Sequence, residues 1–464
     1  MEMFSIKSLA LKWFYFSCVG SVSLYAEFCH LWFKQLGFSP KQIGFTTLMG
    51  GQHFLVLFIL LLADKFRARK AVSFMAIIGV TLTGFMPLLP LVVSLPTCFT
   101  ERNQISRYRF DSGFVIFNNG SMHSGSNMTN SSPQNSIEEA SKMAQSVPWL
   151  SKLFILMTVS RSLNVMFDTV AASLGNLAVV TYLKERSSNY GAYFMWYNIG
   201  GAVSIFTVAF LSWSTRITVC GIEDYGYSLA FIVAACMALF SMVSLPWFEF
   251  EYDQTKTINW ADLKSHLFNF HYVFMFLIIF YAGLCCSFQI YWEFWYLDGL
   301  QASPLLMGGA ALIRRPLLAL SAFVSGNFIR KIGELKTVSL GLLLYSLSFL
   351  ALSFTRIPWF VIGIDIFQAA AYGLILCSMT VHFSKAGSKE NSGFILGLVE
   401  INFAIGFDAG ALTLMGVLFD DLGTRMTLLI YSLTTCLVLF LFVFHIYFSK
   451  HVHGYEKLKQ TTDD

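Results

Sequence analysis

Apolar residues are grouped along this chain of 464 residues into long segments separated by short polar stretches. A helix needs about 20 residues to cross the hydrocarbon core of a bilayer, and twelve segments come near or exceed that length. They cover residues 9–33, 43–62, 71–95, 149–177, 191–213, 228–248, 271–297, 305–327, 337–355, 359–383, 393–417 and 426–448. The pattern therefore predicts an all-α polytopic membrane protein with twelve transmembrane helices.

Two short motifs occur twice, each time where one apolar segment ends and the next begins. A Glu-Phe-x-x-Leu motif at Glu27 recurs at Glu293, an offset of 266 residues. A Ser-Pro-x-x-x-Gly motif at Ser39 recurs at Ser303, an offset of 264 residues. Such repetition is typical of two similar halves, so we expect Glu27 and Glu293 to face each other across a cavity.

The repeat divides the chain into two pseudo-symmetric six-helix halves. The predicted parts are an N-terminal half (1–248), a cytosolic linker (249–270), a C-terminal half (271–448) and a cytosolic tail (449–464).

Composition supports a lipid environment. Hydrophobic residues make up 56% of the chain and charged residues 12%, whereas soluble domains carry about 25% charged residues. The net charge of +4 is small and the basic residues are scattered over loops, which excludes a nucleic-acid-binding surface.

Orientation follows from the basic residues. With a cytosolic N-terminus, eighteen Lys and Arg lie in stretches on the inside and only five in short outside loops. This positive-inside bias predicts that both termini are cytosolic.

The segment 96–148, which the charge bias places outside, is predicted to be a glycosylated loop. It is rich in Ser and Asn and carries the three sequons of the chain, which begin at Asn119, Asn127 and Asn130. Chance sequons in a polar loop are the alternative. Of nine cysteines, only Cys98 and Cys220 are expected on the oxidising side, where they are candidates for a disulfide.

Charged and polar residues gather on particular segments. The third, sixth, ninth and twelfth segments have no Asp, Glu, Lys or Arg in their interiors, whereas the first, fourth, seventh and tenth together hold most of these charges. Their polar stripes are Glu27 on the first segment, Arg161, Asn164 and Asp168 on the fourth, Gln289 and Glu293 on the seventh, and Asp365, Gln368 and Tyr372 on the tenth. Charges are costly in hydrocarbon unless they are paired or hydrated, so the stripes predict a water-filled cavity near the midplane.

The eighth and eleventh segments add Arg314, Arg315, Glu400 and Asp408. Two adjacent cations in mid-membrane need anionic partners, and the candidates are Glu293, Asp365, Glu400 or an anionic substrate.

Structural interpretations stay open for several of these residues. Arg161 and Asp168 are also compatible with a structural ion pair, and Glu27 and Glu293 with contact to the membrane interface. His53 on the second segment fits a hydrogen-bonded packing residue better than a proton carrier.

The turn between the second and third segments combines one acid with several cations: Asp64, Lys65, Arg67, Arg69 and Lys70. Such a cluster can form a gating clasp between helix ends, with anionic lipid head groups as competing partners. Its counterpart at the repeat offset begins at Arg330.

Further motifs carry a family resemblance over nearly the whole chain. They are the Leu62-Ala63-Asp64-Lys65 turn, the run Phe33-Lys34-Gln35-Leu36-Gly37, Thr47-Leu48-Met49-Gly50 with His53, and Tyr190-Gly191 with Trp196 and Gly200-Gly201. The chain resembles the major facilitator superfamily, and within it the domain-containing protein 6 group, most closely its 6-like branch.

The resemblance implies a transporter-type protein whose substrate is largely unassigned. The chain departs from the superfamily pattern at Leu60, where a glycine is usual, at Phe194, where a basic residue is common, and at Arg330, which maps to Asp64. These departures count against an unmodified gating clasp and leave room for a paralogue that does not transport.

The leading hypothesis is a secondary transporter that moves a small polar or anionic solute by alternating access. Candidates for proton coupling are Glu27, Asp168, Glu293 and Asp365, and candidates for substrate charge are Arg161, Arg314 and Arg315. The alternative is a non-transporting membrane glycoprotein, a receptor or scaffold. No enzyme, cofactor or metal motif is found, and we expect a monomer. The chain ends without an endoplasmic-reticulum retention signal, which favours the plasma membrane.

Overall fold

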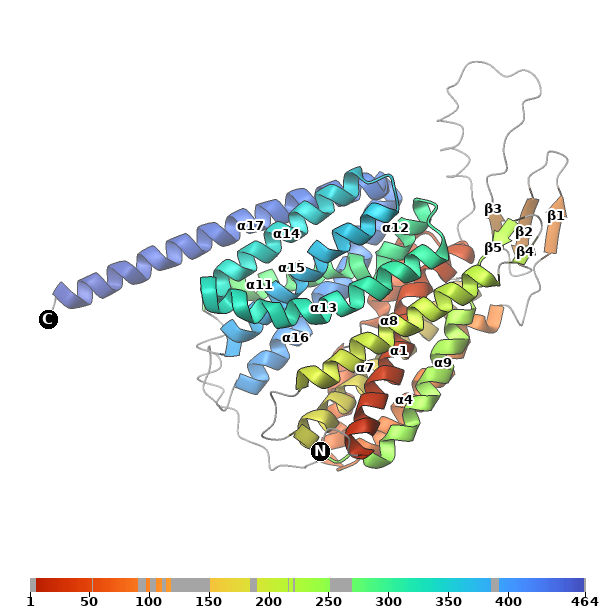
Figure 1. Ribbon diagram of the computed structural model, residues 1–464, viewed down its shortest axis with the longest axis horizontal. Coiled ribbons are helices and arrows are strands. Elements are labelled where there is room, and N and C mark those ends of the chain that lie inside the picture. The colour runs from red at the N-terminus through yellow and green to blue at the C-terminus, as the bar shows by residue number, and fades with distance from the viewer. Residues whose placement is uncertain are drawn as a thin grey trace, which may run out of the picture.

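The computed structural model describes residues 6–51, 53–90, 97–100, 106–110, 114–117, 151–183, 190–215, 217–219, 222–250, 269–384 and 392–462. Figure 1 shows two helical bundles, one coloured red to yellow-green and the other green to blue. The bundles converge near the short strands and diverge toward the side where the chain ends lie. These two sides are called the strand-bearing end and the terminal end below.

The helices of the first bundle come from the N-terminal half. They are α1 (Ile6–Gln35), α2 (Pro40–Gly50), α3 (His53–Lys65), α4 (Arg69–Phe85) with the 3₁₀ turn η2 (Met86–Leu88), α7 (Lys152–Leu183), α8 (Tyr190–Ser214), and α9 (Leu229–Ser241) with the 3₁₀ segment η4 (Met242–Trp247).

The second bundle contains two π-helical segments. Its elements are α11 (Phe270–Ser287), the π-helix η5 (Phe288–Trp292), α12 (Glu293–Gly299), α13 (Pro304–Ile332), α14 (Glu334–Phe354), α15 (Trp359–Ser384), α16 (Ser392–Ala409), the π-helix η6 (Gly410–Gly416) and α17 (Val417–Thr462).

Eleven helical spans in the described part of the chain are long and apolar enough to cross a membrane. They confirm a multi-pass helical membrane protein. Helix α1, the first predicted span, is 30 residues long but is not among the eleven, because its serines, lysines and glutamate lower its hydropathy. The number twelve therefore stays a prediction.

Five short strands in the described part of the chain lie at the strand-bearing end of the bundles. β1 (Thr97–Thr100), β2 (Ser106–Phe110) and β3 (Phe114–Phe117) form an antiparallel meander, and β4 (Ile217–Val219) pairs with β5 (Ile222–Asp224). The sequence predicted a glycosylated loop over 96–148 and did not indicate the strands. They are short and lack a long alternation of apolar and polar residues.

The repeated Ser-Pro motif marks two equivalent helix starts. Ser39 accepts a hydrogen bond from the backbone N–H of Gln42 (3.4 Å), and the Gln42 side chain accepts one from the Ser39 N–H (3.0 Å). Ser303 likewise caps α13 through the N–H of Leu306 (3.3 Å). A proline follows each cap at the first helical position, where its missing N–H costs nothing.

The glycine that ends each Ser-Pro motif lies where the two halves touch. A Cβ on Gly44 of α2 would come within 2.9 Å of the Leu412 Cα in η6. A Cβ on Gly308 of α13 would come within 2.4 Å of the Ala209 Cβ in α8. Each half thus contributes one close-approach glycine to a pair of equivalent contacts between the halves.

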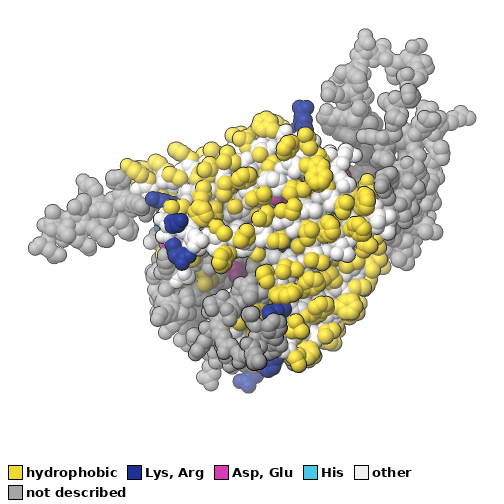
Figure 2. All heavy atoms as spheres, in the orientation of Figure 1, with side chains coloured by type: hydrophobic (Ala, Val, Ile, Leu, Met, Phe, Trp, Pro, Cys, Tyr) yellow, Lys and Arg dark blue, Asp and Glu magenta, His cyan; other side chains and the backbone are white. Residues whose placement is uncertain are grey.

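The buried apolar residues of the described chain form two clusters. The larger core cluster contains residues of both halves, and in it the rings of Phe28 and Phe294 pack edge to face at 5.4 Å. A second cluster lies within the N-terminal half, around Phe14 and Leu174. Figure 2 shows hydrophobic side chains over most of the outer face, with Lys and Arg at its margins, as expected for a surface that faces lipid.

Candidate functional site

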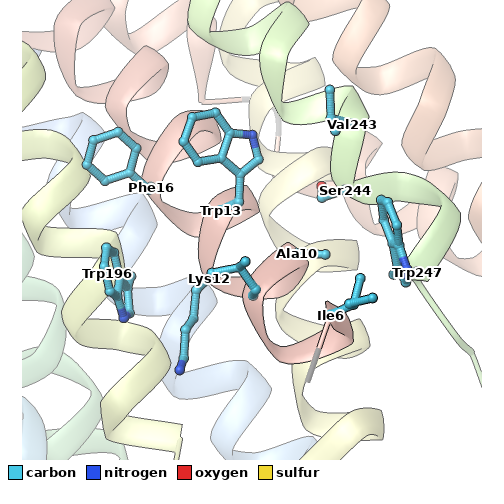
Figure 3. A pocket seen from close by; sticks show the side chains of 10 residues that line it. Ile6, Ala10, Lys12, Trp13, Phe16, Trp196, Val243, Ser244 and Trp247 are labelled. Atoms are coloured by element: carbon cyan, nitrogen blue, oxygen red, sulfur yellow. The ribbon is translucent and has the colours of Figure 1, made fainter. Parts of the chain in front are cut away.

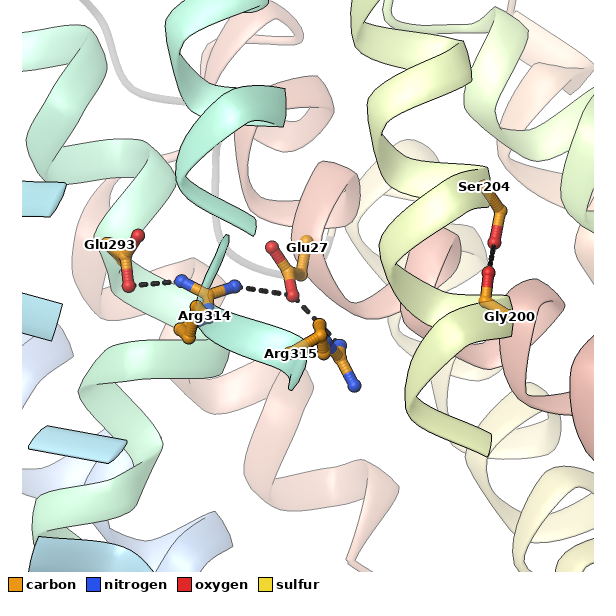
Figure 4. Close-up of polar contacts among 6 residues, drawn as sticks. All are labelled: Glu27, Gly200, Ser204, Glu293, Arg314 and Arg315. Atoms are coloured by element: carbon orange, nitrogen blue, oxygen red, sulfur yellow. Dashed lines mark hydrogen bonds and ion pairs between the residues drawn. The ribbon is translucent and has the colours of Figure 1, made fainter. Parts of the chain in front are cut away.

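A buried ion network joins the two halves. The Arg314 guanidinium of α13 donates from Nη2 to Glu27 Oε1 of α1 (2.6 Å) and from Nη1 to Glu293 Oε2 of α12. The neighbouring Arg315 donates from Nη2 to the same Glu27 oxygen (2.9 Å). Figure 4 shows the resulting chain of contacts. All four side chains are almost fully buried, so the structure brings together the two repeated glutamates through one arginine.

The network contains more acids than bases. Asp365 on α15 is buried and its carboxyl lies beside Glu293. Neither Asp365 oxygen has a hydrogen-bond donor among the described residues. Three carboxyl groups (Glu27, Glu293, Asp365) therefore surround two guanidinium groups. Since buried charge must be balanced, one proton shared between Glu293 and Asp365 would make the cluster neutral.

Two buried glutamines, close in sequence to Glu293 and Asp365, have no hydrogen-bond partner among the described residues. They are Gln289 on η5 and Gln368 on α15. Tyr372, half-buried on the same helix, packs against Phe403 at 6.1 Å between ring centroids.

A separate cavity of about 180 Å³ lies between the halves. Its polar lining comes from Arg161, Asn164 and Asp168 of α7 on one side, and from Tyr291 of η5 and Asp408 of α16 on the other. Tyr25 of α1 and Phe407 of α16 complete the aromatic part of the wall.

Arg161 has an unusual environment in this cavity. Its guanidinium lies 5.2 Å from the ring centroids of both Tyr25 and Tyr291. The side chain is 2% exposed, yet Nε and Nη2 have no hydrogen-bond partner among the described residues. Aromatic faces stabilise a cation, but they leave the N–H groups at its edge available to a planar acceptor.

Asn164 and Asp168 of α7 also line this cavity, and Asn164 in addition contacts a neighbouring helix. Asn164 donates to Thr83 Oγ1 of α4 (3.0 Å), which helps to hold α7 in place. Asp168 has one oxygen without a partner in the described part of the chain. No Arg161–Asp168 ion pair is found there either, so the structural-pair interpretation has no support from the geometry.

Other predicted residues lie apart from both sites. Glu400 is exposed on α16, so it is not the partner of Arg314. His53 begins α3.

The predicted gating turn forms contacts inside the N-terminal half. Asp64 Oδ1 accepts from Arg69 Nε (2.5 Å), and Lys70 donates to the Pro246 carbonyl (2.9 Å). Arg67 has a positive φ of 51° in this turn, and Lys65 lies over the Phe66 ring at 6.0 Å.

Of the residues predicted to be extracellular, Cys98 is in the described part of the chain. Asn119, Asn127, Asn130 and Cys220 lie outside the described residues, and Cys98 lies in β1. Glycosylation and the disulfide stay predictions.

Sequence reasoning missed the aromatic side of the cavity. Tyr25, Tyr291 and Phe407 look like ordinary apolar positions among 47 Phe and 19 Tyr. Tyr291 is also in a π-helical turn, where helical spacing no longer tells which face a residue takes. Asp408 was recognised as a membrane charge, and its position beside the α7 stripe required the tertiary structure.

Two helical halves around a polar interior define a multi-pass membrane transporter. The chain belongs to the MFS_1 like family, whose profile matches residues 8–430. It is therefore of the major facilitator superfamily type, a transporter class and not an enzyme class.

The fold is also similar to crystal structures of the nucleoside transporter NupG. One, of a point mutant, has a TM-score of 0.68 and 14% identity, covering 95% of this chain and 99% of that one. Another has a TM-score of 0.63 and 13% identity, covering 95% and 98%. At these identities the likeness concerns the fold alone.

Proposed function

We propose that this protein is a secondary transporter that binds a small polar solute at Arg161 and moves it by alternating access. The observation that carries the proposal is the buried guanidinium with two N–H-bearing nitrogens that lack acceptors among the described residues, in a cavity between the halves. A buried polar group without a partner costs about 1–3 kcal/mol. A solute that supplies the acceptor recovers that cost, and this favours binding.

The lining suggests the chemistry of the solute. A carboxylate or a carbonyl in a planar group suits the edge of the Arg161 fork, and the Tyr25 and Phe407 rings suit an apolar or planar body. Asp168, whose Oδ1 has no partner among the described residues, can accept a hydrogen bond from an amino or hydroxyl group. We therefore propose a solute with both an acceptor group and donor groups, such as an amino acid or a nucleoside.

Arg314 and Arg315 take a different role in this proposal. Both already donate to Glu27, and Arg314 also donates to Glu293. Both guanidinium groups are already ion-paired with carboxylates, and in each only Nε is a buried nitrogen without a partner among the described residues, so we assign the network to coupling. Loss or gain of the proton shared by Glu293 and Asp365 would change the charge of the network. It would therefore change the strength of the ion pairs between α13 and Glu27 of α1.

Contacts between the halves at the strand-bearing end suit alternating access. Lys34 pairs with Asp298 (2.5 Å) and Lys41 with Asp421 (2.5 Å). Together with the close contacts of Gly44 and Gly308, these pairs hold the halves together at one end, while the bundles diverge at the other (Figure 1). We propose a state open toward the terminal end, with that end in the cytosol, as the positive-inside bias predicts.

The finer assignments belong to the same proposal. We place the protein in the 6-like branch of the domain-containing protein 6 group, as a monomer in the plasma membrane with a glycosylated outer loop. The second candidate is a non-transporting glycoprotein with this fold. It is favoured by Arg330, which stands where Asp64 would map and donates to Asn327 (2.5 Å) instead of forming a clasp.

A binding screen tests the proposal and separates the two candidates. Purified protein is titrated with amino acids, carboxylates and nucleosides while thermal unfolding is followed. A transporter is expected to be stabilised by one class, and Arg161→Lys should weaken that response by about 10–100-fold, because a point charge cannot replace the fork. The matched control is Arg356→Lys on an exposed loop. If no class stabilises the protein, or if Arg161→Lys responds like the control, the site assignment is wrong.

A further inference from the structure

The apolar groove shown in Figure 3 is separate from the Arg161 cavity. It lies at the terminal end, where Trp13 of α1, Trp196 of α8 and Trp247 of η4 line it, and it shares no lining residue with the cavity. Alternating access, the part of the proposed function on which this subsection rests, requires that the cavity open in turn toward each end of the molecule. The residues between the cavity and the strand-bearing end are therefore those that have to move.

His30 of α1 lies on the strand-bearing side of the cavity. Tyr25 of the same helix lines the cavity, and α1 runs from there toward the strand-bearing end (Figure 1). His30 follows Tyr25 by more than one helical turn and is itself not a lining residue. Its side chain is 0% exposed, so water does not reach it in this state.

The imidazole of His30 is held by α2. Its Nε2 is hydrogen-bonded to Thr47 Oγ1 (3.1 Å). The Thr47 hydroxyl donates to the Ile43 carbonyl of its own helix (3.1 Å), so its oxygen accepts from the imidazole. Thr47 also lies on the strand-bearing side, almost one turn before Gly50, where an added Cβ would come within 3.3 Å of the cavity residue Val165.

The same imidazole contacts two aromatic side chains of the other half. It stacks on Tyr291 at 5.2 Å between ring centroids and 27° between planes, and it packs edge to face on Trp292 at 4.8 Å and 61°. Trp292 in turn donates from Nε1 to the Ala411 carbonyl (3.1 Å). Trp292 and Ala411 lie in the π-helical segments η5 and η6, and π-helical turns are frequent at functional sites. His30, Thr47 and Trp292 are called the closing layer below.

Tyr291 connects the closing layer to the proposed solute site. Its ring lines the cavity and lies 5.2 Å from the Arg161 guanidinium. If the halves separate at this level, His30 loses both ring contacts, and Tyr291 is no longer supported from the strand-bearing side. One movement would thus open the cavity toward that end and change the surroundings of Arg161.

We infer that His30 is a positioning residue that keeps the Arg161 cavity closed toward the strand-bearing end by holding Tyr291 and Trp292 of the other half. It acts through these two rings and does not touch the solute. The hydrogen bond to Thr47 fixes the plane of the imidazole, so that one side chain of the N-terminal half meets both rings.

The distance between spin labels at Ser214 and Arg356 tests this inference in the full chain, in lipid nanodiscs and without a solute. Both positions are exposed, and they lie in different halves. His30→Leu keeps most of the volume and removes the ring. We expect it to raise the fraction of molecules with a longer distance by about threefold to tenfold, the effect of one or two lost aromatic contacts.

Two further variants divide the ring contacts from the hydrogen bond. His30→Phe keeps the rings in contact and loses the bond to Thr47, so the fraction should rise by about twofold or less. Thr47→Val should have the same small effect. The matched control is His445→Ala, which removes an imidazole stacked on His271 with almost the same geometry (5.2 Å and 23°) at the terminal end. It should leave the distances unchanged.

The outcomes separate this inference from the proposed function. Should His30→Leu fail to fold, His30→Gln decides, since it offers Thr47 a donor without a ring and should also raise the fraction at least threefold. An unchanged distribution in the variant that folds would overturn the inference and leave His30 as a packing residue, as would an equal rise in His445→Ala. If the expected shifts occur while no solute responds to Arg161→Lys, the site assignment fails and the role of His30 stands.

Discussion

Two buried arginine sites in this molecule differ in what surrounds the guanidinium group. Arg314 donates to two glutamates, one from each half, whereas Arg161 lies between two tyrosine rings with nitrogens that have no acceptor among the described residues. Both side chains are about equally buried. Burial alone therefore does not indicate a binding site. The ion pairs separate the two: Arg314 joins carboxylates of both halves, whereas we propose Arg161, which has no carboxylate ion pair among the described residues, as the residue that binds a solute.

The largest expected effect is on the free energy of unfolding when each buried arginine is replaced by an uncharged residue. Arg314→Met should lower the free energy of unfolding by about 3–5 kcal/mol, because it leaves a buried carboxylate without its cation. Arg161→Met should change it by about 1 kcal/mol or less, since lost cation–π contacts are offset by the removal of an unsatisfied guanidinium. Thermal unfolding in detergent measures both, with the exposed Arg356→Met as control. Equal losses at the two sites would remove the distinction between them.

The charge balance of the Arg314 network can be tested without a substrate. In the unmodified protein a rise in pH should withdraw the shared proton and leave one excess negative charge, so stability should fall as pH rises. Asp365→Asn removes the excess acid, and its stability should lose most of this dependence. Unfolding temperatures from mildly acidic to alkaline pH provide the measurement.

Asp421→Asn is the matched control for that experiment, because Asp421 is a carboxylate of the same half whose side chain is 51% exposed. It should keep the pH dependence of the unmodified protein. A flat profile in the unmodified protein would show that no proton is shared.

A smaller effect is expected where the halves meet. Gly308→Ala places a Cβ within 2.4 Å of the Ala209 Cβ, and such overpacking costs about 1–3 kcal/mol. Separation of the halves at the strand-bearing end removes this steric overlap. The separated halves would let a solute reach Arg161 from that end. Spin labels at Ser214 and Arg356 should report a longer distance. Gly309→Ala, whose Cβ would meet nothing within 4 Å, should leave the distance unchanged.

The smallest effect is expected at an ion pair that water reaches. Lys34 and Asp298 pair across the halves at 2.5 Å, with side chains 36% and 31% exposed. Partly exposed pairs contribute about 0–1 kcal/mol, so Lys34→Gln should shift the spin-label distances only slightly, and less in high salt. The reversed pair Lys34→Asp with Asp298→Lys should restore the original distribution. If Lys34→Gln lowered the free energy of unfolding as much as Arg314→Met does, this ranking would be wrong.

The repeat shows how far sequence reasoning extends. The Ser-Pro caps and the motif glycines were visible as a pattern, and the structure gives them helix starts and contacts between the halves. The Glu27–Glu293 relation was also expected, but not that Arg314 would lie between them. Glu400 was wrong as a partner, because helical spacing does not tell which face of α16 turns toward the other half.

The hydropathy pattern determined that the chain spans the membrane, and the duplicated motifs predicted two related halves. Both follow from local physics, since apolar length and helix capping act within one segment. The tertiary structure decided which buried charges are paired and which are not. Arg161 and Tyr25 come from separate helices of the N-terminal half, and Tyr291 joins them only when the two halves pack together. No single segment is sensitive to this long-range arrangement.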